Sequence, residues 1–481
     1  MTMRKERFAF LLPLVTFACS GNAAIPAPSA DSGVSTDGQA PTDAKATNNT
    51  PPEVAVVSAE AGAFVWEAPA AGEVYANPTV DPDGTTLYVG TNGTGGVLYK
   101  IDGTSGKALA QVQASGAIEH SPALDEKGTL YITTLASELA NGQKGVGHST
   151  AAYRASDLSQ IWEAKMDYGS DNSPVLGTNE RVYVGVVASP KNQSIVDGCH
   201  NNNKCGRYYS FDRNTGDIKI DMWLEGWEAT PAAIDGKNRL FFGVEDITGS
   251  QLSDALWPGV YWAIDGADPS DGSKTARSLW PGERLKTQGD FGSPNQYADG
   301  VAYSTCRDGY LYGFNADNGT IVLKRKLHGS SWTGIAISRA SNGHLVLYTG
   351  DQSGHFYAVE VDGSPEGQLL WEQKTTGSGL AFGTPAIDDV GNIYYTTSKP
   401  TLEVRSSSGA LLWSYNLPGS SLGGVGGPTL LDNGLVVVGT NDNKIMAFRA
   451  FGSHLNDTAP WPKYKHDLRN TSNVTTKTRG R

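Results

Sequence analysis

Six side chains able to bind a ligand recur at one position of this 481-residue sequence. Each lies a few residues before a short apolar segment, and in most copies Ser-Pro or Thr-Pro marks the start of that segment. They are carboxylates, an imidazole and an indole, namely Glu119, His120, Asp171, Glu228, Asp290 and Trp332. Carboxylates among aromatic rings can bind a cation, a sugar or a peptide. Equally, such residues can do no more than hydrate a surface, and no particular metal is predicted.

Cys199 and Cys205 flank a polar loop that begins with His200. If the chain is exported, the two cysteines most simply form a local disulfide. A metal site through these three residues is the alternative, although the closely spaced ligand pairs of structural zinc sites are missing. Cys306 lies in the apolar segment 301–306, and we expect it to be a buried thiol.

The N-terminus has the pattern of a secretory signal. Arg4, Lys5 and Arg7 precede the apolar run 8–18, which is too short to span a bilayer. Cys19 follows at the position where bacterial lipoprotein signals carry the cysteine that is lipidated after cleavage. We therefore predict a lipoprotein-type signal over residues 1–19 with lipidation of Cys19, and ordinary cleavage is the alternative.

Residues 20–62 are rich in Ala, Pro, Ser, Thr, Asp and Asn and contain almost nothing that could form a core. This composition predicts a disordered tether. No later stretch is apolar enough for a transmembrane helix. The net charge of −12 argues against a nucleic-acid partner, because no basic stripe is available to neutralise phosphates. The basic tail 463–481 is expected to be solvated.

The elements that would position the six side chains come from an internal repeat. A unit of roughly forty to sixty residues occurs eight times, which is the length of one four-stranded sheet with its loops. Each unit contains alternating or fully apolar strands and a turn of the type Asp-x-x-Thr-Gly, clearest at Asp212–Gly216. The Asp and Thr can accept backbone hydrogen bonds across the bend. With 58 glycines and only 18% charged residues, the chain is predicted to be all-β.

The last unit stops after residues 444–449 without a fourth strand, and an unassigned segment, 64–67, precedes the first unit and carries Trp66. Pairing these two segments would close a ring without a free edge. We therefore predict an eight-bladed β-propeller of four-stranded antiparallel blades over residues 63–450, closed by an N-terminal strand. Residues 451–481 would form a C-terminal strap and the basic tail. Trp461 and Tyr464 would cover one end of the ring, and a chemical role for His466 and Asp467 is the less favoured interpretation.

The unit resembles the pyrroloquinoline-quinone (PQQ)-type repeat of bacterial β-propellers, whose fourth strand ends in Thr-Gly-x-x-x-Trp. Trp162, Trp371 and Trp413 retain the terminal aromatic residue, while other copies are degenerate. Two copies carry insertions before the Trp, ending at Trp371 and Trp280. The resemblance covers nearly all of residues 63–450. Some proteins with this repeat are binding scaffolds. Others are quinoprotein dehydrogenases that hold PQQ over a Trp floor beside calcium and an Asp base.

The sequence departs from the dehydrogenase pattern. It has no adjacent pair of cysteines and no Cys-x-x-Cys-His haem motif, and no residue matches the Asp base. We therefore expect no cofactor. We favour an exported, lipid-anchored, monomeric binding scaffold at the outer membrane, in the periplasm or at the cell surface over an enzyme. Its partner would be a protein or a small polar ligand at the propeller face. The alternative is a PQQ- and calcium-dependent periplasmic dehydrogenase of sugars or alcohols.

Overall fold

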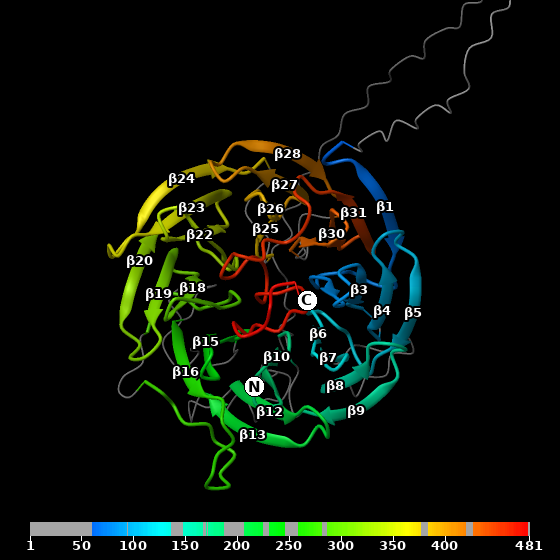
Figure 1. Ribbon diagram of the computed structural model, residues 1–481. Helices are drawn as coiled ribbons and strands as arrows, with labels where there is room; N and C mark the ends of the chain where they lie inside the picture. The colour runs from blue at the N-terminus through cyan, green and yellow to red at the C-terminus, as the bar shows by residue number, and fades with distance from the viewer. Residues whose placement is uncertain are drawn as a thin grey trace, which may run out of the picture. The chain divides into compact units, whose positions relative to one another are not determined.

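The computed structural model describes residues 60–93, 95–135, 148–166, 170, 172–186, 206–224, 230–245, 258–280, 286–376, 383–419 and 427–479. Within these ranges the regular secondary structure consists of β-strands alone. No helix there is long and apolar enough to cross a membrane. The strands form eight sheets around a common axis, so the predicted eight-bladed propeller is confirmed (Figure 1).

In the first, second, third and fifth sheets, the four strands follow one another in chain order from the innermost to the outermost. The first and second are β2 (Thr79–Val80), β3 (Thr86–Gly90), β4 (Val97–Asp102), β5 (Ala108–Gln113), and β6 (Ala123–Leu124), β7 (Thr129–Thr134), β8 (Ser149–Arg154), β9 (Gln160–Lys165). The third and fifth are β10 (Val175–Leu176), β11 (Arg181–Val186), β12 (Gly206–Asp212), β13 (Ile218–Leu224), and β17 (Gln296–Ala298), β18 (Val301–Cys306), β19 (Tyr310–Asn315), β20 (Ile321–Lys326).

The remaining sheets include the fourth, which has three described strands, and the eighth, which the N-terminal strand β1 completes. The fourth and sixth are β14 (Ala233–Ile234), β15 (Arg239–Glu245), β16 (Gly259–Asp265), and β21 (Ala336–Arg339), β22 (Leu345–Gly350), β23 (His355–Val361), β24 (Gln368–Lys374). The seventh and eighth are β25 (Ala386–Ile387), β26 (Ile393–Thr396), β27 (Thr401–Arg405), β28 (Leu411–Asn416), and β29 (Thr429–Leu430), β30 (Leu435–Thr440), β31 (Lys444–Arg449), β1 (Phe64–Pro69).

The ring closes as the sequence predicts. Strand β1 pairs antiparallel with β31, with Trp66 opposite Ala447. Trp66 is buried, and its Nε1 donates a 3.0 Å hydrogen bond to the carbonyl of Gly103 in the first blade. The first and last sheets are therefore joined both by a strand pair and by a side chain.

In the fourth blade, residues 277–280 lie along β16 where the other blades have a regular fourth strand. Ser278 forms a bridge with Ile264, and the Leu279 N–H donates to the Ala263 carbonyl at 2.9 Å. Trp280 then donates to the carbonyl of Ala316 in the fifth blade, as Trp66 does to the first. The insertion before Trp280 thus interrupts the strand but preserves its contact with the next blade.

The Ser-Pro and Thr-Pro signatures join neighbouring blades around the channel. The Ser121 hydroxyl oxygen accepts a 2.7 Å hydrogen bond from the Asn77 N–H of the preceding blade, and Ser173 accepts one of 3.0 Å from the Ser121 N–H. Asn77 in turn accepts from the N–H of Gly427 in the last blade, so these contacts run from the eighth blade through the first and second to the third. A short polar side chain recurs here because a backbone donor of the next or preceding blade would otherwise be buried without an acceptor.

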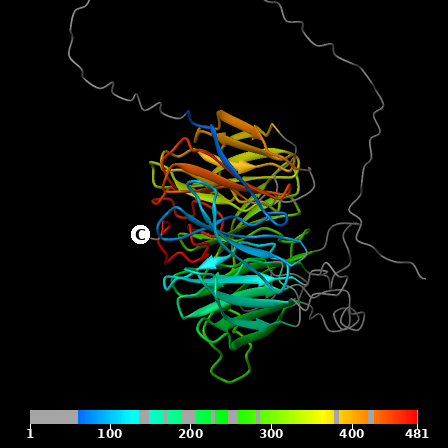
Figure 2. The same cartoon turned by 90° about the vertical axis from the view of Figure 1, so that its right-hand side faces the viewer.

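The C-terminal segment lies over the centre of the ring and to one side of it (Figures 1 and 2). We call residues 459–479 the strap. Its backbone carbonyls accept six hydrogen bonds of 2.7 to 2.9 Å, one from each of six innermost strands. The donors are the N–H groups of Val80, Leu124, Leu176, Ile234, Ile337 and Ile387. The strap therefore closes one end of the channel.

The expectation of a solvated basic tail is wrong for the part of the tail inside the strap. Lys463 and Lys465 are 0% and 1% exposed, and Arg469 is 8% exposed. Acceptors of the strap surround the Lys463 ammonium group, and the Pro174 carbonyl of the third blade accepts from Lys465, which a reading of composition could not reveal.

Candidate functional site

The six candidate side chains precede the innermost strands, and the strap binds where those strands end. Since every innermost strand runs in the same direction along the axis, the loops before them gather at the end of the channel opposite the strap. We call this end the open mouth. Loops that leave the second strand of each blade return to the same end, because the second strand is antiparallel to the first.

Asp290 and Trp332 are brought together at the open mouth by Arg307, which follows β18. Nη1 of Arg307 lies 3.0 Å from Oδ2 of Asp290, and its Cζ lies 3.8 Å from the centroid of the Trp332 ring. The Arg307 N–H also donates to the Asp290 carbonyl at 3.0 Å. An arginine held between a carboxylate and an indole combines an ion pair with a cation–π contact.

The Asp290 carboxylate is buried, with 5% of the residue exposed, and its Oδ1 has no hydrogen-bond partner among the described residues. Burial raises the pKa of Asp290 to about 6, although the positive charge and hydrogen bond of Arg307 oppose the shift. A carboxyl group with such a pKa is partly protonated near neutral pH, so it can either accept or donate a hydrogen bond. Perturbed groups of this kind are enriched at functional sites.

Glu119 lies in a second part of the open mouth, beside Tyr75 of the preceding blade. The Tyr75 hydroxyl donates a 2.5 Å hydrogen bond to Glu73. Burial raises the pKa of Tyr75, and the hydrogen bond to Glu73 and the negative charges of Glu73 and Glu119 raise it further. His120 is half-buried next to Glu119. These residues give this part of the mouth an acidic character.

Asp171 and Glu228 lie outside the described residues, as do Cys19, Cys199 and Cys205. The convergence of all four carboxylates and the proposed disulfide therefore stay predictions. Cys306 is a buried free thiol, as predicted, and burial raises its pKa.

Arg307 and Tyr75 are site residues that the sequence reasoning missed. Arg307 lies in the turn after the second strand, which reaches the same end as the loops before the innermost strands, but the repeat position of the six candidates does not include this turn. The signal was present, since Cys306-Arg307-Asp308-Gly309 ends an apolar strand with a cation and a turn. Tyr75 lies two residues before Asn77-Pro78, just as Glu119 lies two residues before Ser121-Pro122. Tyrosine was not among the residue types identified as candidates at this position.

The strap places a second set of charged groups inside the channel. Nζ of Lys463 donates to the carbonyls of Tyr464 and Asp467 at 3.0 and 3.1 Å, and also to Asn470 Oδ1. Burial lowers the pKa of Lys463 to about 7 and lowers that of Lys465 as well, although the charge of Asp467 opposes both shifts. Lys465 donates to the Pro174 carbonyl of the third blade.

His466 and Asp467 also form polar contacts within the strap. Nδ1 of His466 lies 3.2 Å from Asp467 Oδ2, which also accepts from the hydroxyls of Thr471 and Thr476. Burial disfavours the Asp467 carboxylate, but these hydrogen bonds and the charges of His466 and Arg469 outweigh it and lower the pKa. The arrangement folds the strap on itself, which favours docking over chemistry for this pair.

A pocket of about 850 Å³ lies between the strap and the fifth blade. Charged side chains of both signs line it, among them Asp299, Asp457, His466, Lys477 and Arg479. Arg479 already pairs with Asp432 at 2.9 Å and lies 3.5 Å from Asp457. Since the pocket walls include the strap itself, this is a boundary of the docked strap rather than a continuation of the open mouth.

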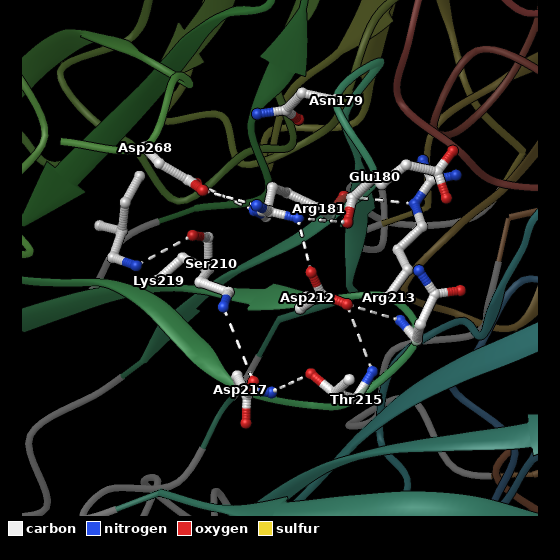
Figure 3. A network of polar contacts seen from close by, with 12 residues as sticks. Asn179, Glu180, Arg181, Ser210, Asp212, Arg213, Thr215, Asp217, Lys219 and Asp268 are labelled. Carbon is white, nitrogen blue, oxygen red and sulfur yellow. Dashed lines mark hydrogen bonds and ion pairs between the residues drawn. The ribbon is translucent and has the colours of Figure 1, made fainter. Parts of the chain in front are cut away.

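An ion-pair network joins the second, third and fourth blades (Figure 3). Arg181 on β11 pairs with Asp212 of its own blade at 2.9 Å and with Asp268 of the fourth blade at 2.5 Å. The hydrogen bond from Arg181 lowers the pKa of Asp268. Arg213 lies 3.4 Å from Glu126 of the second blade. These charges satisfy one another, so the network holds blades together and is not a candidate ligand site.

The sequence model of one family, described as outer membrane protein assembly factor BamB, matches residues 50–219 and 263–461. The chain belongs to this family. A search of curated proteins gives no match.

Solved structures share the fold of this BamB-family chain at low sequence identity. BamB from Moraxella catarrhalis has a TM-score of 0.56 and 15% identity, over 81% of this chain and 98% of that one. The computationally designed protein Ika8 gives 0.58 and 13%, over 81% and 99%. A europium-containing methanol dehydrogenase gives 0.57 and 12%, over 80% and 93%. At these identities the likeness shows the fold alone.

The alternative of a PQQ-dependent dehydrogenase requires that the mouth of this BamB-family propeller can hold a quinone. A planar quinone needs a free aromatic face to stack on, but the guanidinium of Arg307 already lies over one face of Trp332. Arg307 is also neutralised by Asp290 and is not available to a quinone carboxylate without breaking that pair. As arranged, Arg307 and Trp332 do not form a quinone site, and we derive no reaction through the quinone.

Proposed function

We propose that this BamB-family propeller is an exported scaffold of the bacterial cell envelope that binds a protein partner through its open mouth. The family description, which names an outer membrane protein assembly factor, supports a role beside membrane-protein assembly. The proposal is for a binding function without catalysis.

The observation that carries the proposal is the position of the strap, which among the described residues closes one end of the channel. The strap takes up backbone donors from six blades and buries its own charges, so it is a permanent part of the fold at that end. The opposite end presents loops from successive blades, with the Asp290–Arg307–Trp332 cluster among them. Arginine and tryptophan are enriched in the energetically important centres of protein interfaces.

The N-terminal segment would supply the location. In this proposal Cys19 is lipidated and inserted in the outer membrane, and residues 20–62 act as a tether that lets a monomeric propeller reach its partner. A single lipid-modified terminus joined to a long polar segment would leave both faces of the ring accessible. A small polar ligand at the mouth would be a second occupant of the same face.

Photo-crosslinking in living cells tests this function. A photoreactive amino acid is placed either at the open mouth, at His120 or Gln352, or on the strap side, at Lys237 or Asp317. The side chains of Lys237 and Asp317 are 71% and 72% exposed. The proposal predicts one discrete adduct with the same envelope protein from the mouth positions and none from the strap-side positions. Equal labelling from both sides, or no adduct from the mouth, would contradict it.

Localisation is tested separately by fractionation. The wild-type chain should sediment with outer membranes, and Cys19→Ser should release it to a soluble fraction or leave it with an uncleaved signal. If both proteins fractionate identically as mature soluble chains, the lipid anchor is wrong, while the crosslinking result still decides the binding function.

A further inference from the structure

Two histidines and a glutamate meet where the fifth blade passes to the sixth, outside the Asp290–Arg307–Trp332 cluster. His328 follows β20, His355 begins β23 and Glu372 lies on the adjacent β24. Nε2 of His328 is 2.9 Å from Glu372 Oε1, and Nε2 of His355 is 3.6 Å from the same oxygen. One ligand atom from each residue lies within 4.8 Å of the other two.

The tautomer of His355 is set by its neighbours. The Ser353 hydroxyl donates its single proton to Asp351 Oδ1 at 2.7 Å, so at 2.8 Å it accepts from Nδ1–H of His355. In neutral His355 the proton therefore lies on Nδ1, and Nε2 carries a lone pair that faces the Glu372 carboxylate. Two lone pairs 3.6 Å apart are stabilised only if a proton or another cation lies between them.

Ser353 and Asp351 contact His355 in the way that supporting residues contact the histidine ligands of metal sites. A ligating imidazole usually donates its other N–H to a group that fixes the ring orientation, which here is Ser353 on Asp351. Asp351 is fully buried, and its Oδ2 accepts from the Tyr357 hydroxyl at 2.6 Å and from the Gly329 N–H at 2.9 Å.

Ligand type selects the ion. Two imidazole nitrogens and one carboxylate oxygen suit Zn²⁺ and similar divalent transition metals, whereas Ca²⁺ and Mg²⁺ prefer oxygen ligands throughout. Tetrahedral Zn²⁺ would need bonds of about 2.0–2.2 Å. The His328 ring is stacked on His355 with the centroids 4.3 Å apart and the planes 18° from parallel, so it must rotate until its Nε2 lone pair points to the same position as that of His355. His328 can make this movement because its side chain is 58% exposed, and solvent can occupy the fourth position.

We propose that His328, His355 and Glu372 form a binding site for Zn²⁺ or a chemically similar divalent transition-metal ion. The backbone around His328 belongs to the same loop as Trp332, four residues further on. Binding of the ion therefore ties this loop to the sixth blade and restricts the position of Trp332 at the open mouth.

Metal binding by the stripped, mature protein tests the proposal. Isothermal titration with ZnCl₂ is done in a Cys199→Ser/Cys205→Ser background, so that the loop containing His200 does not contribute thiolates. The parent should bind one Zn²⁺, and His355→Ala and Glu372→Gln should each lower the affinity for Zn²⁺ at least tenfold. His344→Ala is the matched control, because His344 pairs with Glu360 at 2.6 Å elsewhere on the sixth blade, and it should leave binding unchanged.

His328→Ala guards against loss of folding, since its side chain is the most exposed of the three, and its metal-free thermal unfolding should match that of the parent. Co²⁺ added to the parent should give the absorption bands of a four-coordinate site, and these should be lost in His328→Ala. Absence of Zn²⁺ binding in the parent, or equal affinity in the parent and the three variants, would overturn the proposal. Neither result depends on whether the mouth binds a protein.

Discussion

The indole of Trp371 in the sixth blade packs directly against Gly409 in the Ser-Gly turn of the seventh. Its Nε1 donates a 2.8 Å hydrogen bond to the Ser407 carbonyl, and a Cβ on Gly409 would lie 2.8 Å from the indole ring. The same contact joins Trp66 to Gly106, Trp162 to Gly216 and Trp280 to Gly319. In these four copies the repeat contains both a Trp and a Gly because the blade places the ring of its Trp against the turn of the next blade.

Gly409→Ala should destabilise the propeller more than Gly343→Ala does. Both glycines have φ near +88°, so both substitutions carry a backbone cost of roughly 1–2 kcal/mol. Only Gly409 faces an indole, whereas nothing lies within 4 Å of the Gly343 position, so Gly409→Ala adds about 1–3 kcal/mol of overpacking. Chemical denaturation of both variants measures the difference, and equal losses would show that the Trp–Gly contact is not required.

Removal of β1 should open the ring. Deleting residues 20–60 leaves β1 intact and should leave the melting temperature almost unchanged. Extending the deletion through Glu67 removes Trp66 and exposes the edge of β31, and it should lower the melting temperature sharply. Indistinguishable melting curves for the two chains would refute closure by β1.

Trp461→Ala should loosen the strap. Trp461 is fully buried, so truncation should cost about 3–5 kcal/mol. Amide hydrogen exchange should become faster at Ile337, whose N–H donates to the Trp461 carbonyl, and at the other innermost strands. Trp223→Ala, at a residue that is 39% exposed on β13, is the control and should leave these amides protected.

The Asp290 carboxyl should make stability depend on pH. Its folded-state pKa of about 6 lies above the ordinary value of 3.8, so between these values the native protein binds more protons than the unfolded chain. The contribution of Asp290 to stability is therefore present at low pH and lost as the pH rises through about 6, by on the order of 3 kcal/mol in total.

Asp290→Asn removes this dependence. The stability of the variant relative to wild type should rise between pH 4 and pH 7, as measured by denaturation at each pH. Asp299→Asn, at a carboxylate whose side chain is 53% exposed and paired with Arg339, is the control and should show no comparable trend. A flat difference for Asp290→Asn would mean that Arg307 fully compensates the burial of the carboxylate.

The repeat made most of the fold predictable from the sequence. Eight similar units and one unassigned Trp-bearing segment determine both the number of blades and the strand that completes the last one, because strand pairing follows from local pattern. In the fourth blade residues 277–280 replace a regular fourth strand, and the insertion before Trp280 indicated this difference.

The site was less predictable because its contacts join separate blades. Asp290 and Trp332 were identified from their repeat position, but Arg307, which joins them, lies in a different loop of the blade. The burial of Lys463 and Lys465 was missed because charged residues are normally solvated, and only the assembled channel provides carbonyls such as that of Pro174. The His328–His355–Glu372 cluster was missed because its members approach one another only across a blade boundary.

The most direct test of the central claim is the affinity of the crosslinked partner for mouth variants of the purified propeller. Arg307→Ala and Trp332→Ala should each weaken binding at least tenfold, and Arg339→Ala, at a half-exposed ion pair beside the strap, should not. The variants are compared only where circular dichroism shows that they remain folded. Unchanged affinity in both mouth variants, or an equal loss with Arg339→Ala, would contradict binding through the open mouth.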